Sequence, residues 1–226
     1  MRDNSPYAAP HSTVVSVQGE QAARVLRNTY MLLGMALAFS AACGWYAMSA
    51  GIGFISPILT LVVYFGLLIF TNVMRNSAAG ILGVFGITGW LGFTTGPMIA
   101  AYAAVPGGME LVTLALASTA VVFVSLSAIA LVTRKDFSFM SQFLMVGIMV
   151  AFLGGLAACF FNLPTLALAV SAAFVLLSSM LILWQTSAII HGGETNYIMA
   201  TVTLFVSIYN LFMSLLHLFT ALSGDD

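Results

Sequence analysis

Charged residues divide the chain into long apolar stretches that contain no Asp, Glu, Lys or Arg. The five stretches cover residues 28–74, 76–109, 111–133, 137–193 and 195–224. A helix needs about 20 apolar residues to cross the ~30 Å hydrocarbon core of a bilayer, so the first and fourth stretches can each hold two helices. Continuous apolar runs, rather than alternating strands of about ten residues, argue against a membrane β-barrel.

Turn-forming residues divide the two longest stretches. Gly51-Ile52-Gly53, followed by Pro57, interrupts the first, and Asn162-Leu163-Pro164 interrupts the fourth. The pattern therefore predicts an all-α integral membrane protein with seven transmembrane helices. These lie near residues 29–50, 55–73, 78–104, 110–132, 139–161, 164–190 and 197–221. Six spans remain the alternative, if one segment of a closely connected pair is re-entrant.

Composition supports a membrane protein. Only 6 % of the residues are charged and 61 % are hydrophobic, whereas an ordinary soluble domain has roughly 25 % charged residues. So few charges could not keep a soluble globule dispersed, which argues against a soluble enzyme and a disordered protein. The net charge of −1 provides no general attraction to nucleic acid, so we expect no nucleic-acid partner.

The positions of the basic residues predict an orientation. The six are Arg2, Arg24, Arg27, Arg75, Arg134 and Lys135. They precede the first span or follow the second and the fourth, and in a seven-span chain these segments share one side. The positive-inside rule makes that side cytoplasmic. We expect a cytoplasmic N-terminus and a periplasmic C-terminus, and with six spans the cations would not fall on one side.

Residues 1–28 differ from the rest of the chain. They contain Pro6, Pro10 and several small polar residues, without the apolar core of a signal peptide. We interpret them as a flexible cytoplasmic tail, followed by a membrane domain over 29–222 and a short periplasmic tail over 223–226. The tail either has no function or offers an exposed end at which an ATP-driven protease can start.

Glycine recurs at every third position of the third predicted span. The series is Gly80, Gly83, Gly86, Gly89 and Gly92, followed by Gly96 and Pro97. At 100° per residue these glycines spiral around the helix, so several neighbours can approach it closely. We expect this span to be central in the bundle, and Pro97 to bend it near its outer end. Tight packing alone, or a hinge or pore-lining role, would explain the series.

Polar residues form a stripe along the seventh predicted span. Its members are Asn196, Thr203, Ser207, Asn210, Ser214 and His217. They share an arc of about 80° on a helical wheel, and Ser171, Ser178 and Gln185 share one face of the sixth span. Polar groups in hydrocarbon require partners, so we expect the two stripes to pair around a polar core. The core either fixes packing through hydrogen bonds or forms a solvated cavity or ion path.

Candidate chemistry is sparse. Neither stripe contains a carboxylate, and His217 is the one titratable group on the seventh-span stripe. Cys43 and Cys159 are expected to be small packing residues. Ser214 and His217 share a helix face, but no oxyanion donor or orienting carboxylate accompanies them. We therefore predict no catalytic site, no metal and no cofactor.

Three segments carry a resemblance to a known family. They are Gly89-Trp90-Leu91-Gly92-Phe93 with Gly96-Pro97-Met98, Trp184–Ser187 with Ile189–Tyr197, and Leu204–Phe212. The second contains a loop motif composed of His191, Gly192, Gly193, Glu194, Asn196 and Tyr197. The chain resembles the Bax inhibitor-1 family, and most closely its bacterial YccA branch, from about residue 25 to residue 222.

The resemblance implies a seven-helix fold with the last helix in the middle. In many members of this family, helices six and seven each supply an aspartate, and the pair acts as a pH-responsive latch on a calcium leak. The matching positions here are Gln185 and Ser207. Without two carboxylates there is no shared proton and no strong cation site, which argues against a proton-gated calcium leak.

The YccA branch is associated with the FtsH membrane protease, as substrates and inhibitors, and with the HflK and HflC proteins. The leading hypothesis is therefore a non-enzymatic, multi-pass modulator of FtsH in the bacterial inner membrane. The alternative is a calcium or proton leak channel through the polar core of helices six and seven. A third hypothesis is a structural partner of another membrane complex.

Overall fold

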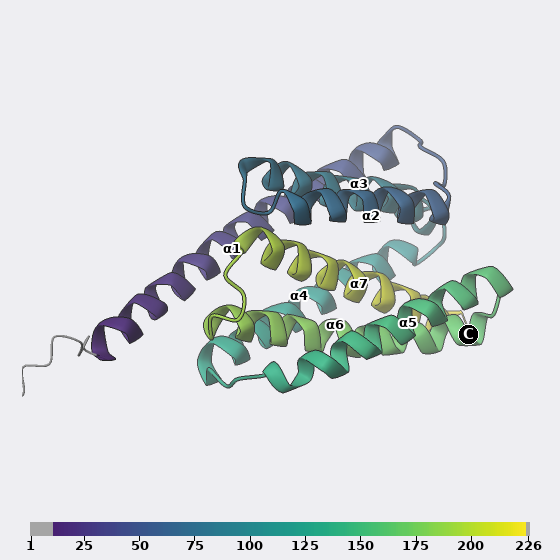
Figure 1. Ribbon diagram of the computed structural model, residues 1–226. Helices are drawn as coiled ribbons and strands as arrows, with labels where there is room; N and C mark the ends of the chain where they lie inside the picture. Colours follow the sequence, from purple (N-terminus) through teal and green to yellow (C-terminus); the bar gives the residue numbers. More distant parts are fainter. Residues whose placement is uncertain (1–10, 225–226) are drawn as a thin grey trace, which may run out of the picture.

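The computed structural model describes residues 11–224, and this part of the chain is helical throughout apart from short connections (Figure 1). The helices are α1 (His11–Ser49), α2 (Pro57–Val73), α3 (Ala78–Ala103), α4 (Gly108–Thr133), α5 (Ser141–Phe161), α6 (Pro164–Ile190) and α7 (Tyr197–Ser223). A single 3-10 turn, η1 (Ser138–Met140), precedes α5. The described residues contain no strand, so the prediction of an all-α chain is confirmed.

Six of the seven helices are long and apolar enough to span a bilayer. The exception is α2, whose 17 residues extend about 26 Å at 1.5 Å per residue. That length falls a little short of the ~30 Å hydrocarbon core. Each predicted span corresponds to a helix, and the structure supports six full-length spans and one shorter apolar helix.

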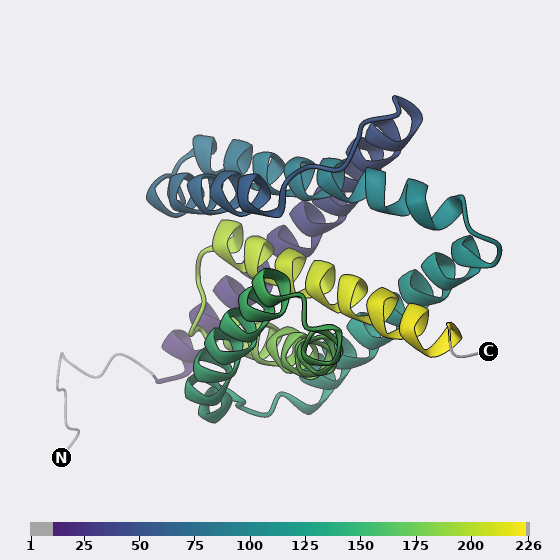
Figure 2. The ribbon, with the colours of Figure 1, turned by 90° about the vertical axis from the view of Figure 1, so that its right-hand side faces the viewer.

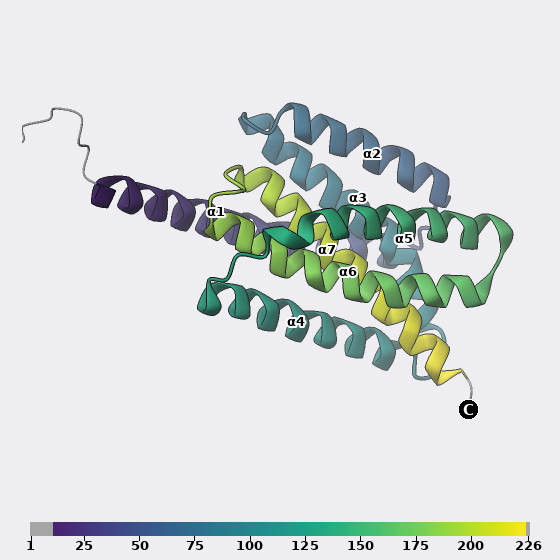
Figure 3. The same ribbon diagram turned by 60° about the horizontal axis from the view of Figure 1, so that its bottom comes forward.

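The N-terminal boundary was predicted wrongly. Residues 11–28 are not a flexible tail, because α1 begins at His11 and runs for 39 residues, or about 58 Å. Once the membrane span is helical, extending it costs far less than nucleating a new helix, and no proline lies between His11 and Ser49 to interrupt it. The N-terminal part of α1 projects beyond the other helices (Figure 3). Residues 1–10 of the predicted tail lie outside the described part.

The last helix lies in the middle of the bundle. It packs against α1, α2, α3, α4 and α6, and Figure 2 shows it between the group of α1 to α3 and the group of α4 to α6. The most apolar window of α7 is 61 % buried, against 50 % for α3 and at most 22 % for the other spanning helices. Both faces of α7 are therefore covered by protein, and α3 is the second most buried helix.

The glycines of α3 allow two neighbouring helices to approach closely. A Cβ at Gly83 or Gly86 would meet Thr71 or Leu67 of α2. Further along α3, a Cβ at Gly92 or Gly96 would run into the backbone of α1. The spiral of glycines thus follows the change of neighbour from α2 to α1. Pro97 is buried inside α3, which continues to Ala103, and the bend expected at Pro97 stays a prediction.

The connections divide between the two ends of the bundle. The α2–α3, α4–α5 and α6–α7 connections lie at one end, and the α1–α2, α3–α4 and α5–α6 connections lie at the other (Figure 1). Arg75, Arg134 and Lys135 belong to the first set, which we call the basic end. The predicted grouping of these cations at one end is therefore present, while the assignment of this end to the cytoplasm stays a prediction.

Candidate functional site

The two polar stripes lie on the neighbouring helices α6 and α7. Of the predicted core residues, Ser178, Gln185, Ser207 and Ser214 are buried, Thr203 and Asn210 are half-buried, and His217 is exposed. The structure joins the stripes where Ser171 Oγ lies 2.7 Å from His217 Nδ1. This hydrogen bond links α6 to α7 near the end opposite the basic end.

The middle of the stripes forms no hydrogen bond between the two helices in the described chain. Ser207 Oγ donates within α7, to the carbonyl oxygen of Thr203 at 2.7 Å. On α6, Ser178 Oγ and Gln185 Nε2 are buried without a hydrogen-bond partner. The stripes are thus adjacent, but they do not form the continuous network of paired groups that we expected.

Unpartnered groups also occur on the helices around α6. Thr29 Oγ1 of α1 and Ser127 Oγ of α4 are also buried without a hydrogen-bond partner. Each such group costs about 1–3 kcal/mol relative to a partnered one. All are neutral, and residues 11–224 contain no group of three His, Cys, Asp or Glu side chains that could hold a metal. This set can donate hydrogen bonds to water, but it offers no charge to a cation.

Two residues that the sequence analysis missed tie α1 to α6 and α7. Tyr30 Oη lies 3.2 Å from Thr186 Oγ1 of α6. Thr201 Oγ1 of α7 is 3.3 Å from the carbonyl oxygen of Thr29, and 2.7 Å from that of Tyr197 in its own helix. Single Tyr and Thr residues in apolar spans carry no periodic signal, so only the fold reveals these contacts.

Ser187 of α6 and His191 of the loop motif hold the α4–α5 connection. Ser187 Oγ donates to the carbonyl oxygen of Lys135 at 2.9 Å and accepts the N–H of Phe137 at 3.2 Å. His191 Nε2 lies 3.0 Å from the carbonyl oxygen of Arg134, and its Nδ1 lies 2.9 Å from that of Ser187. The two ring nitrogens thus lie against carbonyl oxygens of the α4–α5 connection and of the last turn of α6.

A neighbouring carboxylate orders the same connection. Ser138 donates to Asp136 Oδ1 from its hydroxyl at 2.5 Å and from its backbone N–H at 2.9 Å. These hydrogen bonds lower the pKa of Asp136 below its ordinary value, and the bond from the hydroxyl has the largest effect. The nearby His191 lowers the same pKa by a smaller amount. Asp136 is therefore ionised at neutral pH and fixes the turn into η1.

Asn196 joins the α6–α7 connection to the α2–α3 connection. Its Oδ1 accepts the N–H groups of Ile198 at 3.0 Å and Met199 at 3.1 Å, as an N-cap residue does. Its Nδ2 donates to the carbonyl oxygen of Arg75 at 2.9 Å and to Asn76 Oδ1 at 3.0 Å. The sequence analysis counted Asn196 both in the seventh-span stripe and in the loop motif. It precedes α7 in an extended conformation, so it belongs to the loop motif and not to the helical stripe.

The other motif residues shape the same turn. Gly192 has a φ of +73°, a left-handed conformation that favours glycine, and Gly193 follows it. Glu194 Oε1 accepts the N–H of Asn196 at 2.8 Å, and Tyr197 begins α7. We call Ser187, His191 and Asn196, with the backbone that they hold, the loop clasp. It connects all three loops at the basic end.

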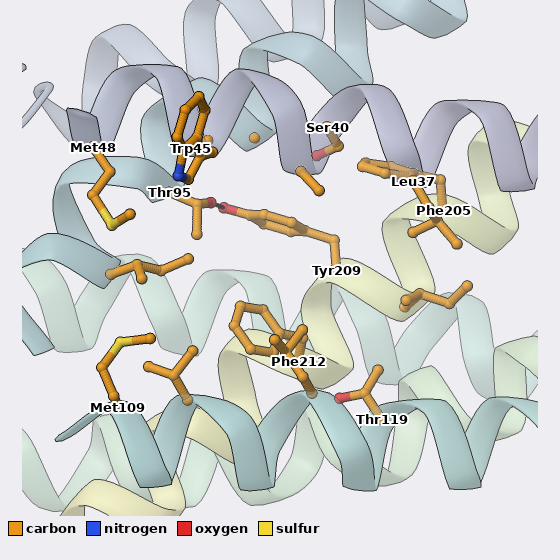
Figure 4. Close-up of a pocket in the computed structure, with 17 residues that line it drawn as sticks. Leu37, Ser40, Trp45, Met48, Thr95, Met109, Thr119, Phe205, Tyr209 and Phe212 are labelled. Atoms are coloured by element: carbon orange, nitrogen blue, oxygen red, sulfur yellow. Dashed lines mark hydrogen bonds between the residues drawn. The ribbon is translucent and has the colours of Figure 1, made fainter. Parts of the chain in front are cut away.

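A cavity of about 340 Å³ lies between α1, α3, α4 and α7 (Figure 4). Its walls are almost entirely apolar, and Tyr209 Oη lies 3.1 Å from Thr95 Oγ1 at its side. The sequence analysis did not predict it, because residues from four helices contribute and no single helix carries its pattern.

Comparison with known proteins places these features in a family. The family model described as inhibitor of apoptosis-promoting Bax1 matches residues 22–224. A Pseudomonas aeruginosa protein is 48 % identical over 89 % of this chain and 91 % of its own length. The Escherichia coli K12 protein named modulator of FtsH protease YccA is 47 % identical over 89 % of this chain and 92 % of its own. A protein named inner membrane protein YccA, from Escherichia coli O6:H1, has the same identity and coverage.

Proposed function

The chain belongs to the Bax inhibitor-1 family, and from this membership we propose that it is a non-enzymatic modulator of the FtsH membrane protease. It is a multi-pass inner-membrane protein, as its apolar helices and the name of a 47 % identical relative indicate. The observation that carries the proposal is similarity to a protein named for FtsH modulation across 92 % of that protein's length.

We propose that the chain acts as a substrate that competes with other substrates because it is slow to dislocate. The loop clasp supports this mechanism, since it ties three connections together at the basic end. The close packing of α3 against α1 and α2 adds to the resistance. Under a pulling force, the time for which the protease is occupied follows the unfolding rate.

The arrangement of Ser214 and His217 supports a non-enzymatic role. Ser214 is buried, whereas the Nδ1 atom of His217 lies against Ser171 of α6. The histidine is therefore engaged by a different serine from the one that its spacing suggested. An acyl-transfer site would also need oxyanion donors and an orienting group.

A second candidate is an ion leak through the α6–α7 core. The observation that favours it is the pair of buried, unpartnered groups on α6, Ser178 Oγ and Gln185 Nε2, which water could satisfy. The neutral side chains at 185 and 207 weigh against a cation site. Ion flux into proteoliposomes tests this candidate, with Gln185→Asp and Ser207→Asp as variants. Flux equal to that of empty vesicles for all three proteins excludes it.

Co-purification from native membranes tests the leading proposal. A tagged chain is expected to recover FtsH, and we propose that HflK and HflC accompany it. The matched control is an unrelated multi-pass protein with the same tag, produced at the same level. Recovery of FtsH no higher than with this control contradicts the proposal.

A further inference from the structure

The cavity between α1, α3, α4 and α7 provides almost no site for water. Its lining has no charged residue among those that the structure describes, and its four hydroxyl-bearing residues are Ser40, Thr95, Thr119 and Tyr209. Thr95 Oγ1 lies 2.7 Å from the carbonyl oxygen of Leu91, and Thr119 Oγ1 lies 2.7 Å from that of Ala115. Tyr209 Oη pairs with Thr95. A buried water needs 2–4 polar partners, so these walls favour hydrocarbon.

The cavity is continuous with the lipid-facing surface of the bundle. Within residues 11–224, α1 and α4 touch through Tyr30 and Phe123. Neither residue lines the cavity, and the cavity opens sideways between the two helices. Trp45 of α1 is 68 % exposed, and Leu116 of α4 is 52 % exposed. Both residues line the cavity (Trp45 is labelled in Figure 4). A membrane lipid can therefore reach the cavity without crossing the protein.

The length of the cavity matches one leaflet. Its lining extends along α1 from Leu37 to Met48 and along α4 from Met109 to Thr119. At 1.5 Å per residue each distance is about 15 Å, half of the ~30 Å hydrocarbon core. Met48 and Met109 lie close to the helix ends that are opposite the basic end. The cavity thus runs from that membrane surface to the middle of the bilayer.

We propose that the cavity binds one acyl chain of a phospholipid from the leaflet opposite the basic end. The occupant must be apolar and about 15 Å long, since the walls are almost entirely apolar and extend along α1 and α4 for that distance. A single hydrocarbon chain fits this shape. Since lipid and cavity are equally apolar, binding rests on the dispersion contacts that an empty cavity would lose.

Native mass spectrometry of the full chain, gently extracted and titrated with phosphatidylethanolamine, tests the proposal. Leu116→Trp fills the cavity, while Leu114→Trp is the matched control, because Leu114 is 50 % exposed on the same helix and does not line the cavity. We expect one retained phospholipid per chain in the natural protein and in L114W, and about tenfold weaker binding in L116W. Equal binding by all three proteins, or none by the natural one, overturns the proposal.

A second pair of variants guards against misfolding of L116W. Ala41 lines the cavity, whereas its neighbour Ala42 does not. Ligand binding to the native state raises the unfolding temperature. We therefore expect added phospholipid to stabilise the natural protein and Ala42→Phe, but not Ala41→Phe. Equal stabilisation of the three proteins would show that lipid solvates the whole bundle, and it would overturn the proposal. Cross-links from the cavity to a second copy of the chain would overturn it as well.

Discussion

Asn196 joins the α6–α7 connection to the α2–α3 connection, which lies about 120 residues earlier in the chain. Its side chain caps α7 through Ile198 and Met199 and holds the backbone of Arg75 as well as the side chain of Asn76. The side-chain amide of Asn196 thus uses both its oxygen and its NH₂ group. It lies where the α2–α3 connection meets the α6–α7 connection. At the scale of single residues, the loop motif is a structural connector.

Replacing Asn196 by alanine should therefore weaken the bundle. The cap alone contributes about 1 kcal/mol, and with the bonds to the α2–α3 connection we expect a loss on the order of 2 kcal/mol. Thermal unfolding in lipid-containing micelles measures the effect. The control is Asn210→Ala, a half-buried asparagine on α7 outside the clasp. Equal unfolding temperatures for the two variants would show that the clasp contributes nothing.

Replacing Gln185, unlike replacing Asn196, is expected to leave the stability of the bundle unchanged or to raise it. Its Nε2 is buried without a partner, so Gln185→Met removes a penalty of about 1–3 kcal/mol and keeps the volume similar. Ser187→Ala is the comparison, because Ser187 Oγ has partners in Lys135 and Phe137. Equilibrium unfolding should find Q185M as stable as the natural chain or more stable, and S187A less stable. A loss in Q185M as large as that in S187A would indicate a hydrated core.

Sequence reasoning at this scale located the polar residues but not their partners. A helical wheel can show that Ser178, Gln185 and Ser207 share faces. The wheel does not show how far one helix is shifted along its neighbour or how it is rotated against it. The wheel also counts Asn196 with the stripe, because a regular 100° step cannot show where a helix begins, whereas the loop motif places this residue correctly before α7. The partners of Asn196 lie 120 and 121 residues away, beyond any local pattern.

The helix α3 shows how a sequence pattern determines packing between elements. Gly83 and Gly86 face α2, and Gly92 and Gly96 face α1, so the glycine spiral matches a helix held between two others. The third-residue repeat was visible in the sequence and predicted close approach from several sides. Which helices approach could not be predicted, since glycine carries no information about its neighbour.

Gly92 of α3 should not tolerate a methyl group, because the backbone of α1 lies against it. A Cβ at Gly92 would overlap the Ser40 carbonyl group of α1, so Gly92→Ala is expected to cost about 1–3 kcal/mol through overpacking. The matched control is Gly66→Ala on α2, where no heavy atom lies within 4 Å of the added carbon. There we expect no loss, or a gain of up to about 1 kcal/mol. Equal thermal stability of the two variants would contradict the packing account.

The whole molecule is an apolar helical bundle, and the hydrogen bonds of the loop clasp connect its loops at the basic end. Uncharged stretches predicted the number and approximate positions of its helices, because hydrocarbon excludes charge wherever the chain crosses it. They could not predict that α1 begins at His11, since a helix that extends beyond the membrane needs no apolar residues. They could not predict the cavity either, because residues from four helices line it.

Residues 1–10 precede α1 and lie outside the described part, and we propose them as the starting handle for FtsH. Deleting residues 2–10 should lengthen the lifetime of the chain in cells with active FtsH, because the protease loses its starting end. Pulse-chase labelling measures the lifetime. A scrambled segment of the same composition is the control and should leave it unchanged. An unchanged lifetime after the deletion would contradict the handle.

The most direct test of the central claim is the rate at which purified FtsH degrades a labelled membrane substrate in proteoliposomes as this chain is added. Competition predicts that the rate falls as the natural chain increases, while the chain itself is consumed slowly. Asn196→Ala should be consumed faster and should inhibit less, because its clasp is opened. A degradation rate that stays constant over the whole range of added chain would contradict the account.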